Sequence, residues 1–261
     1  MLISPQDGFS DSAMRQQESL IVKYVNLLLR RLHEKSENGA TPLNAEAWYN
    51  FITFDITGEL VFGESFGSLE ASEYHPWIKH MFSLVHFGAL TACISYLGFH
   101  WLVQFIYRNA GTSSARRLRA VTENMVRNRL EMKNRSDDLF EGLARRREEW
   151  NLSLDHLSSN ALILLIAGSE TTATTLSGAT YLALAHPEVL ERLTKEVRSA
   201  FSSADEITIS SAGKLSYMLA VLNESLRMYP PVLSNMLRQV PKGGAMVAGH
   251  FVAENVSLFA S

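Results

Sequence analysis

Residues 161–185 read ALILLIAGSETTATTLSGATYLALA, and this stretch decides what kind of fold the chain can adopt. Its first part, residues 161–168, is apolar on every side, which is typical of a helix that is buried all round. Ser153 can cap the start of this helix, and Pro187 suits the first turn of the next one. The pattern therefore predicts a long central helix over about 152–185 and a mainly α fold around it.

Composition supports a mostly helical globular protein. The chain has 261 residues, of which 46% are apolar and 20% are charged, so wholesale disorder is excluded. Its 15 glycines and 7 prolines are too few for the turns of a β-sandwich. The net charge of −3 gives no reason to expect nucleic acid as a partner. Cys93 is the only cysteine, so an internal disulfide and a cysteine-based zinc cluster are both excluded, and no metal ligand is expected from this chain.

Polar groups interrupt the apolar centre of this helix. Because an unpaired carboxylate is costly to bury, we expect Glu170 to be paired, protonated or facing a wet cavity. Threonine is a poor helix former, and a run of threonines after Gly168 is expected to loosen the helix and leave room for a ligand or water. The run comprises Thr171, Thr172, Thr174 and Thr175. From the residues alone, a polar stripe that contacts a neighbouring helix is an equally good interpretation.

A second segment carries an acid and a base at helical spacing. Glu224 and Arg227 are three positions apart in a helix expected over about 215–228, so they share a face and can pair. The rest of this helix is apolar, which predicts that the pair is buried and specifies geometry more than it stabilises. Taken alone, a Glu-x-x-Arg sequence is also common as an ordinary surface pair.

The two segments together, in this order and at this spacing, resemble those of the cytochrome P-450 family of haem-thiolate monooxygenases. The central helix of that family carries Ala/Gly-Gly-x-Asp/Glu-Thr-Thr/Ser, matched here by residues 167–172. Further on the family carries Glu-x-x-Arg and a Pro-Pro turn, matched by residues 224–231. The upstream part, from Phe9-Ser10-Asp11 through residues 62–67, resembles the fungal secondary-metabolism branch. The resemblance covers residues 1–261 as a single partial P-450 domain, mainly α with a minor β segment near its C-terminus.

The resemblance implies roles for individual residues of the central helix. Glu170 and Thr171 match the acid–alcohol pair that relays protons to oxygen bound at the haem. Ala167 and Gly168 match small positions that leave room for oxygen and substrate, and with Thr171 they are expected on the cofactor side.

Further roles follow for the second segment and the strands after it. Glu224 and Arg227 match a structural pair that holds the core beneath the haem. Arg238 matches a position that often binds a haem propionate, for which the guanidinium fork is suited.

The family also implies partners and a location. These are haem, O2, electrons from NADPH supplied through a reductase, and a lipophilic small-molecule substrate. Residues 80–107 contain no Asp, Glu, Lys or Arg. This stretch matches the family's helices that roof the substrate site and often touch the membrane. We interpret it as two helices around a bend. A full-length member is expected at the endoplasmic reticulum membrane.

Departures from the family pattern keep two alternatives open. Cys93 does not match the family's haem-ligand loop, Phe-x-x-Gly-x-Arg-x-Cys-x-Gly, and nothing here matches the N-terminal anchor, so the chain is expected to be an internal fragment. Residues 251–261 are expected to form a strand that ends before anything pairs with it. The alternatives are a truncated, catalytically inactive remnant and a helical membrane-associated interaction protein that uses residues 80–107.

Overall fold

The computed structural model describes residues 15–109, 112–132, 140–233 and 236–260 of the chain. Most of these residues are helical, in agreement with the predicted mainly α fold. The longer helices are α2 (Glu18–Lys35), α3 (Ala45–Phe62), α5 (Pro76–Tyr96), α6 (His100–Asn109), α7 (Thr112–Glu131), α9 (Leu154–Ala185), α10 (Pro187–Ala200) and α12 (Ser216–Met228). The short ones are α4 (Ser68–Ala71), α8 (Glu141–Arg145), α11 (Ile209–Ala212) and the 3-10 turn η1 (Ala204–Glu206).

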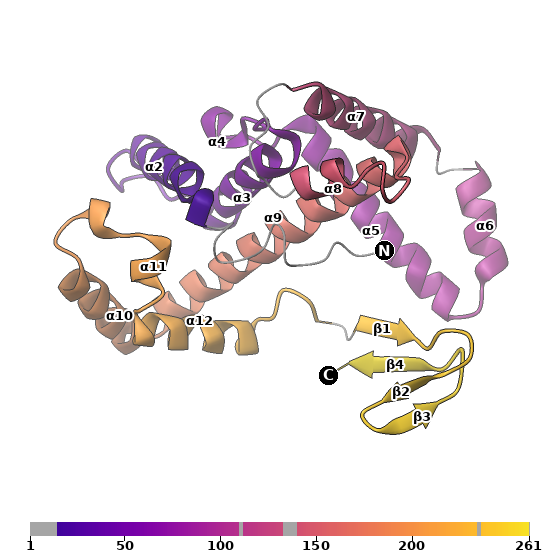
Figure 1. Cartoon of the computed structure of the whole chain (residues 1–261). Helices are drawn as coiled ribbons and strands as arrows, with labels where there is room; N and C mark the ends of the chain where they lie inside the picture. Colours follow the sequence, from indigo (N-terminus) through magenta and orange to yellow (C-terminus); the bar gives the residue numbers. More distant parts are fainter. Residues whose placement is uncertain (1–14, 110–111, 133–139, 234–235, 261) are drawn as a thin grey trace.

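The strands form two small antiparallel sheets near the C-terminal end of the described chain (Figure 1). Strand β1 (Met236–Gln239) pairs with β4 (Ser257–Ala260), and β2 (Ala245–Val247) pairs with β3 (His250–Val252). The prediction of an unpaired terminal strand is therefore wrong. The chain folds back through β2 and β3, which brings Phe259 of β4 opposite Leu237 of β1.

Helix α9 runs through the middle of the molecule, and α3 packs along it (Figure 1). The main hydrophobic core includes Phe54 and Phe62 of α3 and Leu157 and Leu165 of α9, all essentially inaccessible to solvent. Two contacts fix α3 antiparallel to α9. The Oη of Tyr49 and the Oγ1 of Thr180 are 2.7 Å apart near one end. Near the other end, a Cβ built on Gly168 would lie 3.2 Å from Cγ2 of Thr57.

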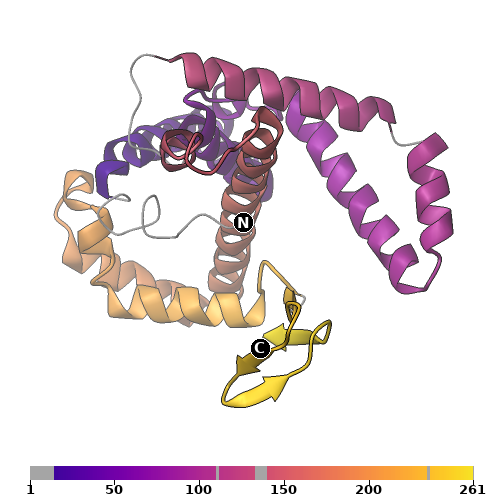
Figure 2. The ribbon, with the colours of Figure 1, turned by 45° about the vertical axis from the view of Figure 1, so that its right-hand side comes forward.

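The ends of the helices follow from local chemistry. The hydroxyl of Ser153 accepts a hydrogen bond from the amide of His156, so Ser153 caps α9 as predicted. Gly63 ends α3 with a φ of 74°, which a residue with a side chain rarely adopts. Gly98, with a φ of 85°, lies between α5 and α6. The uncharged stretch therefore does form two helices around a bend (Figure 2).

Helix α9 is continuous across the threonine run, so the predicted loosening is wrong. The hydroxyls of Thr171, Thr172 and Thr175 donate to the carbonyl oxygens four residues earlier, over 2.6, 2.9 and 2.8 Å. These bonds add to the backbone ladder without replacing it, because a carbonyl oxygen has two lone pairs.

None of the helices within the described ranges combines the length and the apolar character needed to cross a bilayer. The interpretation of residues 80–107 as two helices around a bend is consistent with that finding.

Asp55 gives a first testable prediction. Its buried carboxylate accepts hydrogen bonds from the amides of Ser68 (3.1 Å) and Leu69 (2.8 Å), which caps the start of α4. Replacing Asp55 with alanine should lower the free energy of unfolding by roughly 1–3 kcal/mol, because two buried donors lose their acceptor. Urea unfolding of both proteins measures this difference.

The pH dependence of that difference has a definite sign. Burial raises the pKa of Asp55, against the opposing effect of the two amide donors. A carboxyl whose folded pKa is raised contributes stability that is present below its unfolded pKa and is lost as the pH rises through the folded value. The difference between the wild type and Asp55→Ala should therefore shrink as the pH rises through that window. A difference that grows with pH would contradict the assignment.

Candidate functional site

The two faces of α9 differ sharply around the predicted site. Ala161, Leu165, Ser169 and Ala173 follow one another at four-residue spacing and are all buried. A helix turns by about 100° per residue, so positions two residues further along lie on the opposite side. Those positions include Ile163, which is 62% exposed, and Ala167, which is also exposed. Ala167 and, one turn later, the half-buried Thr171 therefore belong to an open face of α9 that points away from the packed stripe.

Thr171 presents its hydroxyl on this side in a defined orientation. Its Oγ1 donates to the carbonyl oxygen of Ala167 over 2.6 Å. Because the hydroxyl hydrogen is committed to that carbonyl, the oxygen lone pairs remain available to accept a hydrogen bond. The structure thus brings together Ala167 and Thr171.

Glu170 is half-buried, and its Oε1 is shielded from solvent. The carboxylate lies close enough to Tyr74, in the segment before α5, to affect that phenol. Burial raises the pKa of Tyr74 first, and the negative charges of Glu46 and Glu170 raise it further. Glu170 therefore lies near Tyr74, whose ring packs against Phe51 of α3 and Phe82 of α5, and it is turned by about 100° from Thr171 on the helix.

Gly168 lies at a close approach of α9 to α3. A Cβ at this position would lie 3.2 Å from Cγ2 and 3.5 Å from Oγ1 of Thr57. The glycine therefore permits the close contact between the two helices at the point where the acid–alcohol segment begins.

The predicted pair of Glu224 and Arg227 forms on α12, with Nε to Oε2 at 2.8 Å and Nη2 to Oε1 at 2.6 Å. This fork holds the pKa of the Glu224 carboxyl below its usual range. The prediction that the pair is buried is wrong, since the two side chains are 59% and 67% exposed. Helix α12 packs against α9 and α10 through another face, of which Ser225 is the buried residue.

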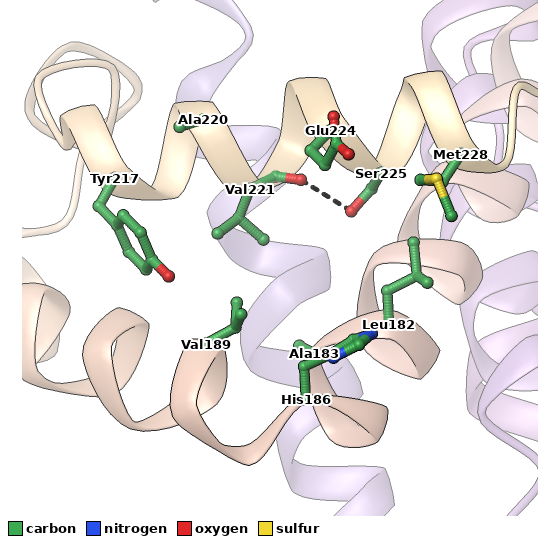
Figure 3. A pocket seen from close by; sticks show the side chains of 10 residues that line it. All are labelled: Leu182, Ala183, His186, Val189, Tyr217, Ala220, Val221, Glu224, Ser225 and Met228. Carbon is green, nitrogen blue, oxygen red and sulfur yellow. Dashed lines mark hydrogen bonds between the residues drawn. The ribbon is translucent and has the colours of Figure 1, made fainter.

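Helices α9, α10 and α12 enclose a mostly apolar pocket of about 340 Å³ (Figure 3). Its lining includes Ala183, Val189 and Val221. Beside it, the ring of Tyr229 covers Gly178, where an added Cβ would lie 2.8 Å from Cδ1. Leu182, which lines the pocket, is eleven residues after Thr171 on α9, about 16 Å along the axis, so this pocket is separate from the acid–alcohol segment.

Arg238 lies on β1 opposite Leu258 of β4, and it is exposed. The sheet follows α12 and is separated from the middle of α9 in both views (Figures 1 and 2). The structure does not bring Arg238 together with Glu170 or Thr171.

The open face of α9 fits one side of a haem. It offers the small Ala167, the apolar Ile163 and the hydroxyl of Thr171, and the half-buried Glu170 follows Ile163 at seven-residue spacing on the same side. The iron-ligand side is different. Cys93, the only cysteine, lies exposed on α5 without the flanking residues of a haem-ligand loop. Across the described ranges no three His, Cys, Asp or Glu side chains gather as a metal site would require.

Sequence reasoning missed two polar residues beside this site, namely Thr57 of α3, which lies against Gly168, and Tyr74, whose pKa is raised in part by the charge of Glu170. A signal was available. Glu46, Asn50, Thr53 and Thr57 recur at helical spacing within an otherwise apolar segment, and such a stripe marks one polar face.

Comparison with known proteins identifies the family of this chain. The cytochrome P450 family profile matches residues 6–260. Trichothecene C-15 hydroxylase of Fusarium sporotrichioides is 42% identical over 260 residues, which cover 95% of this chain and 51% of that protein. Cytochrome P450 monooxygenase lcsI of Purpureocillium lilacinum is 39% identical over 263 residues, covering 100% of this chain and 51% of that protein.

A third relative shows the same pattern of coverage. Averantin hydroxylase of Dothistroma septosporum is 41% identical over 246 residues, covering 94% of this chain and 46% of that protein. The chain thus spans about half the length of the curated relatives that it matches. With a family match over nearly its whole length and the acid–alcohol segment on an open face of α9, this chain belongs to the cytochrome P450 family.

Proposed function

We propose that this chain forms the oxygen-activating half of a haem-dependent monooxygenase that inserts one oxygen atom from O2 into a lipophilic substrate. Electrons come from NADPH through a reductase. The observation that carries the proposal is the position of Thr171 and Ala167 on the open face of α9, with Glu170 beside them at the junction with α3 and α5. Neither an inactive remnant nor a membrane-associated interaction protein is favoured by a comparable observation.

Within this proposal the residues of α9 transfer protons and keep room for oxygen and substrate. The haem, when bound against the open face of α9, supplies the oxygen chemistry. Glu170 takes up protons at its carboxylate, and the Thr171 hydroxyl holds the hydrogen-bonding position at the cofactor. Ala167 keeps the face open for oxygen and substrate. Gly168 keeps α9 tight against α3, so that Glu170 stays at the junction.

Two further assignments belong to the same proposal. Arg238 binds a haem propionate through its guanidinium fork. Glu224 and Arg227 act as a structural pair. Their side chains are exposed on α12, so this face of the helix is open for packing.

The substrate class follows from the relatives. Two of them are named as hydroxylases, of a trichothecene and of averantin. We assign to this protein the hydroxylation of a lipophilic secondary metabolite of terpenoid or polyketide type.

The proposal is tested by sequencing the native transcript through the codon of Ser261 and beyond. An in-frame Phe-x-x-Gly-x-Arg-x-Cys is the expected result. The protein encoded by that transcript should then show the ferrous carbon monoxide spectrum of a haem thiolate. A transcript that ends without this motif would overturn the proposed activity.

The tip formed by the end of α5 and by α6 is proposed to touch a membrane surface, in keeping with a place at the endoplasmic reticulum. Figure 2 shows that these helices extend away from the rest of the molecule. Large apolar side chains are exposed along the tip: Leu90 (59%), Tyr96 (78%), Leu97 (74%), Phe99 (48%), Trp101 (67%) and Phe105 (59%). Aromatic residues of this kind favour the interface between water and lipid.

A vesicle assay gives a second testable prediction. Replacing Trp101 and Phe105 together with serine should reduce co-sedimentation with phosphatidylcholine vesicles by at least about tenfold, since each lost aromatic removes roughly 1.5–3 kcal/mol of apolar burial. Tyr181→Ser is the matched control, because Tyr181 is 71% exposed but lies on α9. If this control lowers binding as much as the double variant, the tip is not the contact.

A further inference from the structure

The turn between α2 and α3 contains the dipeptide Asn38-Gly39, and its backbone is left-handed at three consecutive positions. The φ angles are 50° at Glu37, 60° at Asn38 and 92° at Gly39. Asparagine and glycine adopt this conformation more readily than other residues, so an Asn-Gly pair is typical of a tight turn. Both residues are exposed. The turn therefore presents to solvent an asparagine side chain and the backbone amide that follows it.

The space around Gly39 is open. Within the described part of the chain, a Cβ built on Gly39 would meet no heavy atom within 4 Å beyond its chain neighbours. Because glycine carries no side chain, nothing at this position hinders the approach of its backbone nitrogen to the side-chain carbonyl carbon of Asn38. Attack of that nitrogen on that carbon closes a succinimide ring. This ring closure is the first step by which an asparagine loses its amide.

The hydrogen bonds that hold the Gly39 amide are local. This amide donates to the carbonyl oxygen of Ser36 over 2.9 Å and to the hydroxyl of Ser36 over 3.2 Å. The amide of Thr41 donates to the same carbonyl oxygen over 2.9 Å. Because these bonds join residues within 36–41, the turn can open while α2 keeps its packing on α3. Opening frees the Gly39 nitrogen for the attack.

Two other asparagines with a left-handed backbone are held more firmly. They are Asn151, with a φ of 48°, and Asn255, with a φ of 64°. Asn151 precedes Leu152, which packs against the main hydrophobic core. Asn255 precedes Val256, whose carbonyl oxygen accepts from the amide of Val240 over 3.0 Å. At both positions the next residue has a side chain that hinders ring closure, and a contact with another segment restrains the backbone.

We propose that Asn38 is a modification site, at which the side-chain amide is lost by spontaneous deamidation. The Gly39 nitrogen bonds to the side-chain carbonyl carbon of Asn38, and the amide leaves as ammonia with the proton of the Gly39 nitrogen. Water then opens the ring at either of its carbonyl groups and yields aspartate or isoaspartate. No oxidant or reductant is needed, and the step does not depend on the proposed haem chemistry.

The products change the charge and the backbone just after α2. One neutral amide becomes a carboxylate, so the formal net charge of −3 becomes more negative by one unit. The new carboxylate follows Lys35, the last residue of α2, where the helix dipole disfavours a negative charge. Isoaspartate also lengthens the main chain by one carbon, which shifts Gly39 and Thr41 relative to Ser36. Both products should therefore unfold at a lower urea concentration than the intact protein.

Peptide mapping of the full-length protein tests the site. After incubation at mildly alkaline pH, the peptide with Asn38 should gain about 1 Da, whereas the peptides with Asn151 and Asn255 should keep their mass. The rate at Asn38 in the folded protein should stay within about tenfold of the rate in urea, because the turn opens at little cost. An Asn38 that deamidates in urea but stays intact in the folded protein would overturn the proposal.

Two variants serve as matched controls in ion-exchange chromatography. Asn38→Gln keeps an exposed amide, but its longer side chain would have to close a larger ring, so the acidic species that accumulates in the wild type should be absent. Asn38→Asp should elute with that species from the start and unfold at the urea midpoint of the aspartate product. If Asn38→Gln gives as much of the acidic species as the wild type, the modification lies elsewhere and the proposal fails.

Discussion

Replacing Thr171 with valine is expected to lower the product formed per NADPH by about 10²-fold, in line with the roughly 10²–10⁴-fold contribution of positioned proton-transfer groups. Valine keeps the shape of threonine but lacks the hydroxyl that bonds the Ala167 carbonyl and faces the open side of α9. Electrons drawn from NADPH should then leave as hydrogen peroxide. Product and peroxide are measured together in the reconstituted full-length protein.

Thr172→Val is the matched control for this experiment. Thr172 makes the same kind of bond, from Oγ1 to the carbonyl oxygen of Gly168 at 2.9 Å, but it is turned away from Thr171 by about 100°. We expect its coupling to remain within about twofold of the wild type, because its hydroxyl is outside the proton-transfer geometry. Equal losses in the two variants would mean that the threonines act through helix stability and not through Thr171 itself.

Replacing Arg129 with leucine is expected to lower the free energy of unfolding by roughly 3–5 kcal/mol, the usual cost of leaving one member of a buried ion pair alone. Nη2 of Arg129, on α7, lies 3.9 Å from Oε2 of Glu141 on α8, and the two side chains are only 3% and 7% exposed. Without Arg129 the carboxylate of Glu141 stays in the interior, and Arg145, whose Nε donates to its Oε1 over 3.2 Å, is exposed to solvent. Urea unfolding measures the loss.

Two further variants decide whether the loss comes from the buried charge. Arg129→Leu combined with Glu141→Leu should recover most of the stability, because removing both charges removes the desolvation cost as well. Arg119→Leu, in the exposed pairs with Glu123 and Asp155, should cost less than about 1 kcal/mol. If Arg129→Leu costs no more than Arg119→Leu, the buried pair does not stabilise the fold.

Local signals in the sequence predicted the parts of the fold that depend on neighbouring residues. Ser153 caps α9 as predicted, because capping is settled within a few positions. Two helices around a bend were predicted within residues 80–107, and the structure places the bend at Gly98. The acid–alcohol segment was recognised because its residue types are unusual inside an apolar helix.

Features that depend on distant segments were not predictable in this way. The exposure of Glu224 and Arg227 is decided by which face of α12 meets α9 and α10. The stretch around Glu141 is strongly charged, yet Glu141 is buried against Arg129. Charge patterning shows that a residue is polar, but only the tertiary contacts show whether an oppositely charged residue is buried beside it.

The pairing of α3 with α9 also has a consequence for how the chain is made. Tyr49 and Thr180, which bond to each other, are separated by 131 positions. At a synthesis rate of about 5–20 residues per second, α3 leaves the ribosome roughly 7–26 seconds before its partner exists. During that interval its apolar side chains have no α9 to cover them. Shortening this interval by faster translation between the two helices should therefore raise the yield of folded protein.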